Sequence, residues 1–253
     1  MSTPRGIGVS AATDAARVSD VLVARGAPSP PAAMGWARAR GVADTVACRA
    51  LDLVGAGILL LLLAPVLIAL AIAIRLESPG PCLFRQRRIG RGLEGFTVHK
   101  FRSMREDADP AKHREYVQAL IGGTNNAIQR AGDGPSLYKL AVDDRITRVG
   151  RVLRSLSLDE LPQLLDVLLG RMSLVGPRPV IPYEVERYPE EWLERFATKP
   201  GMTGLWQVSG RNECTYEEMV QFDIEYVRTR TLLRDLGILV RTPVVVLARR
   251  GAA

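Results

Sequence analysis

Two adjacent carboxylates, Asp159 and Glu160, are the side chains of this 253-residue sequence best suited to catalysis. Arginines lie on both sides of the pair in the chain, with Arg154 shortly before it and Arg178 between two prolines after it. An aspartate can attack phosphorus and carry the transferred group as an acyl phosphate, while Mg²⁺ held by carboxylate and phosphate oxygens offsets the developing charge. Guanidinium groups bind the oxygens of a diphosphate. These residue types together predict phosphoryl transfer.

A purely structural explanation of the same carboxylates is also open. Leucines recur at helical spacing over residues 158–168 and predict one short amphipathic helix. Pro162 is tolerated best in a first helical turn, which places both carboxylates at the positive end of the helix dipole. Ser157 and Glu160 have the spacing of a capping box, and Asp159 would then only favour the dipole. Spacing alone does not decide between a helix cap and a catalytic pair.

The element that must position this chemistry is a long apolar segment. Residues 53–74 carry no charged side chain and are mostly Leu, Ile, Ala and Val, which is enough to cross a hydrocarbon core of roughly 30 Å as a helix. A cleavable signal peptide is not expected, because the segment starts late, exceeds a typical signal core and ends at Arg75 without a small-residue cleavage pattern. Pro65 bends such a helix. Basic residues flank both ends, so a re-entrant hairpin and a kinked spanning helix both remain open.

Basic residues are concentrated directly after the apolar segment. Residues 75–105 contain eight of them against two acidic residues, within a chain of net charge +7 and pI near 9.7. They are Arg75, Arg85, Arg87, Arg88, Arg91, Lys100, Arg102 and Arg105. One explanation is a contact with anionic lipid, worth about 1 kcal/mol per basic residue near the surface. Another is a phosphate-binding floor. Nucleic acid is not expected as a partner, because the patch adjoins a membrane segment and lacks interleaved aromatic residues.

The cysteines and histidines suggest neither a disulfide framework nor a metal site. Cys48, Cys82 and Cys214 are far apart in the sequence and show no paired spacing, which favours a reducing compartment. His99 and His113 lie outside any metal-binding spacing. We therefore expect both histidines to be surface or packing residues.

Composition divides the chain into three parts. Residues 1–42 are rich in Ala, Ser, Pro, Gly and Arg and are predicted to be a disordered tail. Residues 43–76 form the membrane helix, and residues 77–250 form the remaining domain. A strand signal at 96–99, next to a glycine-rich turn, predicts a small hairpin. We expect a mostly helical α+β fold that is associated with a membrane.

Two further segments have less definite assignments. Residues 108–135 are polar with clustered glycine turn signals and are predicted to form a variable surface loop. Residues 231–250 mix Leu, Val and Ile with arginines, a composition that suits a helix at a membrane interface and suits core packing equally well.

Several long segments, in order, resemble one known family. Between about Ala47 and Leu247 the chain is similar to the bacterial sugar transferases, the monotopic phosphoglycosyl transferases that load the first sugar phosphate onto polyprenyl phosphate. The resemblance rests on the helix with its central Pro65 and on four sequence segments, SPGPCLFRQRRIGR, FTVHKFRSM, DDRITRVGRVLRSLSLDELPQLLDVLLGRMSLVGPRP and KPGMTGLWQVSGR. Several long motifs in the right order are far more specific than any short pattern.

The resemblance implies a ping-pong reaction. Asp159 attacks the phosphate nearest the sugar of a UDP-sugar, UMP leaves, and polyprenyl (undecaprenyl) phosphate then takes the sugar phosphate from the aspartate. Glu160 assists, by proton handling or by supporting the metal, and Asp159 is the expected carboxylate ligand of Mg²⁺. The implied phosphate or nucleotide contacts are Lys100, Arg102, Arg154 and Arg178, with Arg211 as a weaker candidate.

The resemblance also implies a location and a pathway. Members of this family use a re-entrant helix with both ends in the cytoplasm, so we expect the catalytic domain on the cytoplasmic face of the bacterial inner membrane, in contact with lipids. The reaction would begin exopolysaccharide, capsule, O-antigen or glycoconjugate synthesis, with later glycosyltransferases as possible partners. Asp144 stands where the family commonly has proline, and residues 122–135 belong to a region that differs among members and bears on sugar choice.

Two other functions remain as alternatives to sugar-phosphate transfer. A membrane-bound Leloir-type glycosyltransferase would move only the sugar and release UDP. A non-catalytic membrane scaffold for polysaccharide assembly would not need the carboxylate pair. The sequence does not name the sugar, the polymer or the oligomeric state, because a pocket that distinguishes hydroxyl positions depends on geometry.

Overall fold

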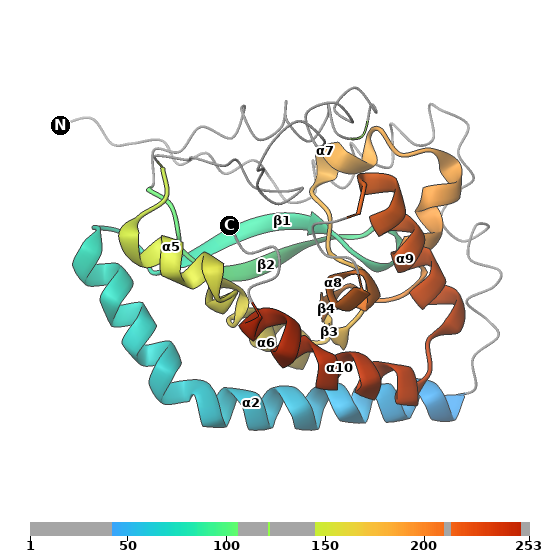
Figure 1. Cartoon of the computed structure of the whole chain (residues 1–253), viewed down its shortest axis with the longest axis horizontal. Helices are drawn as coiled ribbons and strands as arrows, with labels where there is room; N and C mark the ends of the chain where they lie inside the picture. Colours follow the sequence, from blue (N-terminus) through green and yellow to red (C-terminus); the bar gives the residue numbers. More distant parts are fainter. Residues whose placement is uncertain (1–41, 106–120, 122–144, 210–213, 249–253) are drawn as a thin grey trace.

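The computed structural model describes residues 42–105, 121, 145–209 and 214–248 (Figure 1). The helical elements are α2 (Val42–Glu77), η2 (Arg91–Leu93), α5 (Arg148–Ser155), η3 (Leu158–Glu160), α6 (Gln163–Leu168), α7 (Pro182–Val185), η4 (Glu190–Ala197), α8 (Leu205–Ser209), α9 (Tyr216–Thr229) and α10 (Leu232–Leu247). The strands are β1 (Leu83–Ile89), β2 (Gly95–Phe101), β3 (Ser173–Val175) and β4 (Gly201–Thr203). The predicted mostly helical α+β fold is confirmed. The predicted tail and nearly all of the predicted variable loop lie outside the described residues.

Helix α2 is the membrane candidate that the sequence predicted. Its segment Thr45–Glu77 is long and apolar enough to cross a membrane, and only 6% of its most apolar window is buried against the rest of the protein. Pro65 lies inside the helix, which bends part-way along its length (Figure 1). Proline bends a helix because it has no N–H to donate and its ring clashes with the preceding turn. The apolar side chains of α2 therefore face outward from a kinked helix.

Both arms of α2 are attached to the domain. Near its start, buried Asp52 accepts hydrogen bonds from Ser173 Oγ at 2.8 Å and from the Leu174 N–H at 2.8 Å, which joins the helix to β3. Near its end, Ile74 is buried against Phe101 of β2. Hydrogen bonds are directional, so a buried carboxylate that accepts two of them fixes the orientation of the helix and also holds it against the domain. Both arms thus lie against the same domain.

The hairpin predicted within 84–101 is confirmed. Strands β1 and β2 pair in antiparallel register from Leu83 opposite Phe101 to Ile89 opposite Gly95. The short helix η2 closes the turn, with Gly92 at a φ of 68°, a value that glycine adopts without strain. The hairpin carries cationic side chains of the site on both strands.

A second pair of strands was not predicted. Strands β3 and β4 are parallel, and three residues each are too few to show an alternating pattern in the sequence. Their close approach requires glycine, because a Cβ on Gly201 would lie 2.0 Å from the Gly176 nitrogen. This pair places the proline-rich loop that follows β3 beside the site.

The prediction of one helix over 158–168 is only partly right. The segment is divided into the single 3₁₀ turn η3 and the separate helix α6, with Pro162 at the N-cap of α6. Ser157 is in the left-handed region at a φ of 54° and makes no capping hydrogen bond with its side chain, so the capping box predicted with Glu160 is absent. Proline cannot donate within a helix, and it therefore starts α6 instead of lying inside its first turn.

One of three buried apolar clusters among the described residues lies between the hairpin, α6, β3 and α10. It contains Val98, Leu164, Val167, Leu174 and Ile238, all nearly inaccessible to solvent. Each is a β-branched or branched aliphatic side chain on the inward face of its element. Burial of this kind, at about 25 cal/mol per Å² of apolar surface, holds the short elements in place.

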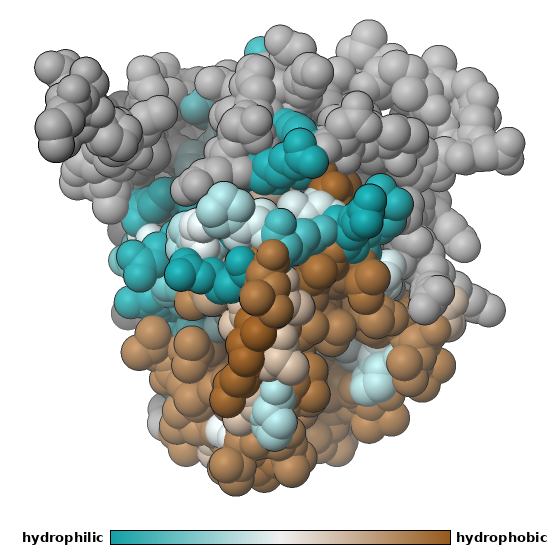
Figure 2. Space-filling model, turned by 90° about the vertical axis from the view of Figure 1, so that its left-hand side faces the viewer, coloured by the Kyte–Doolittle hydropathy of each residue, from teal (hydrophilic) through white to brown (hydrophobic). Residues whose placement is uncertain are grey.

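Helix α10 satisfies both of the explanations that its sequence allowed. Asp235 and Ile238 are buried against the core. The opposite face exposes Leu233, Leu236, Val240, Val244 and Leu247. Figure 2 shows apolar surface gathered over the lower part of the molecule, where α2 and α10 run in Figure 1, below a band of hydrophilic surface. A continuous apolar base of this kind is typical of a protein that is embedded in one face of a membrane.

The packing of α5 gives a direct test of the fold. A Cβ on Gly150 would lie 2.1 Å from the backbone oxygen of Ser103, so Gly150→Ala must push α5 away from the end of the hairpin. We expect a loss of about 1–3 kcal/mol of stability, measured as a lower thermal midpoint of the purified protein.

Gly237→Ala in α10 is the matched control, because a Cβ there meets nothing within 4 Å. Its expected change is neutral or a gain of up to about 1 kcal/mol from helix propensity. Equal midpoints for the two variants would contradict the close contact between α5 and Ser103.

Candidate active site

The carboxylate pair lies on η3, between α5 and α6. The left-handed Ser157 turns the chain at the end of α5, and Pro162 starts α6 directly after the pair. Asp159 and Glu160 are therefore on a partly buried turn and not inside a regular helix. Both line a cavity of about 900 Å³.

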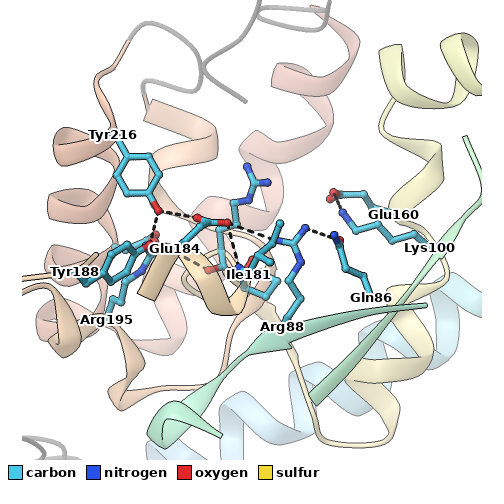
Figure 3. A network of polar contacts seen from close by, with 12 residues as sticks. Gln86, Arg88, Lys100, Glu160, Ile181, Glu184, Tyr188, Arg195 and Tyr216 are labelled. Carbon is cyan, nitrogen blue, oxygen red and sulfur yellow. Dashed lines mark hydrogen bonds and ion pairs between the residues drawn. The ribbon is translucent and has the colours of Figure 1, made fainter. Parts of the chain in front are cut away.

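Cationic side chains line the same cavity. They come from the hairpin and the segment just after it, from the segment before α5, from the end of α5 and from the loop after β3. They are Arg88, Lys100, Arg102, Arg105, Arg145, Arg154 and Arg178. Lys100 Nζ lies 2.9 Å from Glu160 Oε1, which joins β2 directly to the carboxylate pair (Figure 3). A cavity with two carboxylates and several guanidinium groups is equipped to bind a diphosphate and to do chemistry on it.

Glu160 is ionised at neutral pH. Burial alone would raise the pKa of its carboxyl, but the attraction of Lys100, Arg178 and Arg88 outweighs burial and lowers the pKa to about 2. Arg88 remains charged as well, although burial and repulsion from Arg178 lower its pKa to about 10. The site therefore holds a carboxylate among cations in its resting state.

The loop that carries Arg178 is fixed through its backbone. The Gly201 N–H donates to the Pro177 carbonyl at 2.8 Å, and Arg88 Nη1 donates to the Pro179 carbonyl at 3.0 Å. Arg195 Nη2 donates to the carbonyl of Arg178 itself at 3.3 Å. Proline on both sides restricts the backbone further. The arginine side chain is thus held at the cavity by a rigid support.

The structure brings together most of the residues that the sequence predicted for the site. Lys100, Arg102, Arg154 and Arg178 line the cavity together with both carboxylates. Arg211 lies outside the described residues, so its predicted contact stays a prediction.

Arg102 differs from the other predicted phosphate contacts in how its guanidinium is used. It is buried and donates to the carbonyl oxygens of Pro79 at 2.6 Å and Ser78 at 2.8 Å, just after α2. These bonds give Arg102 a definite structural task, because they hold the chain that leaves the membrane helix. Its predicted phosphate contact stays a prediction.

Arg88 is a residue of the site that sequence reasoning missed. It is buried on β1, lines the cavity, and donates to Gln86 Oε1 at 2.7 Å (Figure 3). The sequence showed it only as one of eight basic residues after the apolar segment. The signal for Arg88 was its place in a predicted hairpin, because alternate residues of paired strands share one face, and Arg88 lies on the same face as Lys100.

His99 is a packing residue, as expected. The ring Nδ1 of His99 lies 2.9 Å from Asp166 Oδ1, and the backbone N–H of His99 donates to Asp166 Oδ2 at 2.9 Å. Asp166 is completely buried in α6, so the contact fixes α6 against β2. His113 lies outside the described residues. Cys48, Cys82 and Cys214 are all described, and no disulfide joins them.

The carboxylate pair fits a magnesium ion that is shared with a substrate. Mg²⁺ is commonly held by one or two carboxylates together with phosphate oxygens and water. Asp159 and Glu160 offer such oxygens at the cavity, and the described residues contain no group of three His, Cys, Asp or Glu side chains that would form a closed metal site. The donor set therefore suits Mg²⁺ bound jointly with a diphosphate.

The other side of the cavity is apolar. It is lined by Leu59 and Leu63 of α2, Leu83 and Phe84 of β1, and Val246 of α10. The outward faces of these helices form the apolar base of the molecule (Figure 2). One cavity thus connects a charged floor with the surface that suits a membrane.

Comparison with known proteins identifies the family. Residues 43–249 match the bacterial sugar transferase family, and the chain belongs to it. It is 44% identical over 204 residues to the undecaprenyl-phosphate galactose phosphotransferase of Salmonella typhimurium. The alignment covers 81% of this chain and 41% of that protein. The chain is also 38% identical over 207 residues to the exopolysaccharide production protein ExoY of Rhizobium meliloti. That alignment covers 82% of this chain and 88% of that protein.

A third relative carries a different sugar in its name. The chain is 44% identical over 205 residues to the UDP-glucose:undecaprenyl-phosphate glucose-1-phosphate transferase of Caulobacter vibrioides, covering 77% of this chain and 67% of that protein. The chain spans only about two fifths of the length of some curated relatives, 41% for the Salmonella protein and 41% for the UDP-galactose-lipid carrier transferase of Erwinia amylovora. The family match over residues 43–249 contains every residue that lines the cavity.

The low pKa of Glu160 predicts how stability depends on pH. Because the folded pKa is about 2 and the ordinary value is 4.5, the ionised carboxylate stabilises the fold above pH 4.5, and this contribution is lost as the pH falls towards 2. The difference in thermal midpoint between the wild type and Glu160→Gln should be constant above about pH 5.5 and shift in favour of the variant below pH 4.5.

Lys100→Met is the matched variant for this experiment. It removes the main partner of Glu160, so the difference between Lys100→Met and the double variant with Glu160→Gln should depend less on pH. Parallel curves for the wild type and Glu160→Gln between pH 7 and 3 would contradict the lowered pKa.

Proposed function

We propose that the protein transfers a sugar 1-phosphate from a UDP-sugar to polyprenyl (undecaprenyl) phosphate and releases UMP. The observation that carries the proposal is the single cavity in which Asp159 and Glu160 face a cluster of cations on one side and the apolar walls of α2 and α10 on the other. A water-soluble diphosphate and a lipid phosphate must both reach the reacting carboxylate. The cavity offers cations for their phosphate groups and apolar walls for the lipid. The names of the relatives support the same reaction.

The reaction proceeds in two displacements at one phosphorus atom. An Asp159 oxygen bonds to the phosphorus nearest the sugar, the bond from that phosphorus to the bridging oxygen breaks, and UMP leaves with the bridging oxygen. An oxygen of polyprenyl phosphate then bonds to the same phosphorus, and the bond to Asp159 breaks. Arg154 and Arg178 bind the phosphate oxygens during both steps. Mg²⁺, when bound by the carboxylates and the diphosphate, would offset the developing negative charge.

Glu160 supports the site as an anion. With a pKa of about 2 it carries no proton to donate at neutral pH, and it holds Lys100 by their 2.9 Å contact. Its charge limits the repulsion between the cations of the floor before substrate arrives. When a diphosphate binds, Lys100 can exchange Glu160 for a phosphate oxygen, which leaves Glu160 available to the metal.

The attachment of α2 supports a re-entrant arrangement. Asp52 near its start and Ile74 near its end both contact the domain, and the helix bends between its two arms. A helix that crosses the whole bilayer would carry one of these contacts to the far side. Within this proposal, both ends of α2 lie on the cytoplasmic face of the inner membrane, with the apolar base in contact with lipids.

The relatives bear on substrate and pathway in a limited way. Their names mention galactose, glucose and exopolysaccharide production, so a hexose is the first donor to test. Within this proposal the product feeds later glycosyltransferases that extend the lipid-linked sugar into exopolysaccharide, capsule, O-antigen or another glycoconjugate.

The test is nucleotide release by protein in nanodiscs with Mg²⁺, polyprenyl phosphate and UDP-glucose or UDP-galactose. The wild type should form UMP, and Asp159→Asn should lose activity by a factor on the order of a thousand or more, because the nucleophile is gone. Without acceptor, the peptide that contains Asp159 should gain the mass of a sugar phosphate. Glu217→Gln, an exposed change on α9, is the control and should keep full activity.

The alternatives give different products in the same experiment. UDP in place of UMP would show transfer of the sugar alone, as in a Leloir-type glycosyltransferase. No nucleotide release from any donor by folded wild-type protein would favour a membrane scaffold. UMP formed equally by Asp159→Asn would exclude this aspartate as the nucleophile.

A further inference from the structure

Two buried arginines hold consecutive carbonyl oxygens of the loop that carries Arg178. Arg195 Nη2 donates to the Arg178 carbonyl at 3.3 Å, and Arg88 Nη1 donates to the Pro179 carbonyl at 3.0 Å. Their exposed fractions are 1% for Arg195 and 4% for Arg88. Arg195 comes from η4 and Arg88 from β1, so hydrogen bonds from two different elements hold the loop.

Each guanidinium group lies beside a buried carboxylate, and that of Arg195 is hydrogen-bonded to it. Arg195 forms an ion pair with Asp223 of α9, and both side chains are inaccessible to solvent. Arg88 Nη1 lies 3.9 Å from Glu184 Oε1 on α7. A guanidinium with its position set by a carboxylate can direct a second donor at a chosen carbonyl, because its N–H groups lie in one rigid plane.

Two tyrosines join these ion pairs into one network (Figure 3). Arg195 Nη1 donates to the Tyr188 hydroxyl at 2.8 Å, and the Tyr188 hydroxyl is hydrogen-bonded to that of Tyr216. Tyr216 in turn donates to Glu184 Oε2 at 2.6 Å. Together with the contact of Glu184 to Arg88, this chain fixes the spacing between the two arginines that hold the loop.

Stability alone is a poor explanation for this network. Buried ion pairs lose much of their attraction to desolvation, and well-packed apolar side chains in their place are often as stable. The network ends on two carbonyls of the Arg178 loop, and neither Arg195 nor Tyr216 is among the described residues that line the cavity. The network therefore serves to fix the position of the Arg178 loop at the cavity.

We propose that Arg195 and Tyr216 are positioning residues, which act on the reaction through the backbone of Arg178. The inference rests on the proposed function, in which Arg178 binds the phosphate oxygens. A displacement of about 1 Å at such a group costs up to about a hundredfold in rate. Loosening the loop should therefore lower kcat/KM for the UDP-sugar by about tenfold or more, although neither residue touches substrate.

The experiment compares Arg195→Lys and Tyr216→Phe with a matched control. Lysine keeps the charge beside Asp223 but cannot form the forked contact that also reaches the Arg178 carbonyl. Arg228→Gln is the control, since Arg228 pairs with Glu194 on the surface and joins the same two elements, α9 and η4, without contacting the loop. Its activity should be unchanged.

A double-mutant cycle separates positioning from general stability. Arg195→Lys should lower the rate of UMP formation about tenfold in the wild-type background and by less than about twofold in an Arg178→Lys background, because its effect passes through Arg178. Equal losses in the two backgrounds, or no loss in the wild type, would overturn the inference. If Arg195→Lys does not fold, Tyr216→Phe removes only one hydroxyl and is judged by the same cycle.

Hydrogen–deuterium exchange gives a readout that does not need the reaction. Amides of residues 172–185 should exchange faster in Arg195→Lys than in the wild type, and at the wild-type rate in Arg228→Gln. Unchanged exchange in Arg195→Lys would show that Arg195 does not hold the loop in place, whatever the activity of the variant. Wild-type protein that forms no UMP would instead overturn the proposed function, and the positioning role with it.

Discussion

Repulsion between cations is the constraint on which this site depends. A cavity that binds a diphosphate needs several positive side chains close together, and Arg178 already lowers the pKa of Arg88 through its charge. The fold meets this requirement with buried or partly buried carboxylates, Glu160 beside Lys100 and Glu184 beside Arg88. Backbone carbonyls accept the remaining N–H groups. The cations are therefore held in place before any substrate supplies its negative charge, which is what electrostatic preorganisation requires.

The membrane sets the second condition. In the proposed reaction the carboxylates must lie at the depth of lipid phosphate groups, and the apolar base made by α2 and α10 would set that depth. Asp52 fixes the first arm of α2 to β3, and the loop of Arg178 directly follows β3. The membrane candidate α2 and the loop that carries Arg178 are thus joined through one short strand. A helix that only anchored the chain would not need a buried carboxylate on the domain side.

The sequence predicted the regular and locally encoded parts of this fold. The uncharged run in α2, the bend at Pro65 and the hairpin between β1 and β2 follow from composition, proline chemistry and turn residues. It failed where local signals compete. Pro162 divides the expected helix into η3 and α6, and the capping box of Ser157 does not form because that residue turns the chain in the left-handed region. The strands β3 and β4 are too short to give a pattern.

By itself the sequence determined the identity of the chemical groups, because carboxylates, guanidinium groups and an apolar helix keep their properties in any fold. It also placed them in segments typical of the bacterial sugar transferases. Only the tertiary structure decided which of these groups meet. Lys100 and Glu160 are 60 positions apart, and Arg195 reaches the carbonyl of Arg178 and a carboxylate on α9 at once. Such contacts depend on the packing of distant elements, and the spacing of residues along the chain does not encode them.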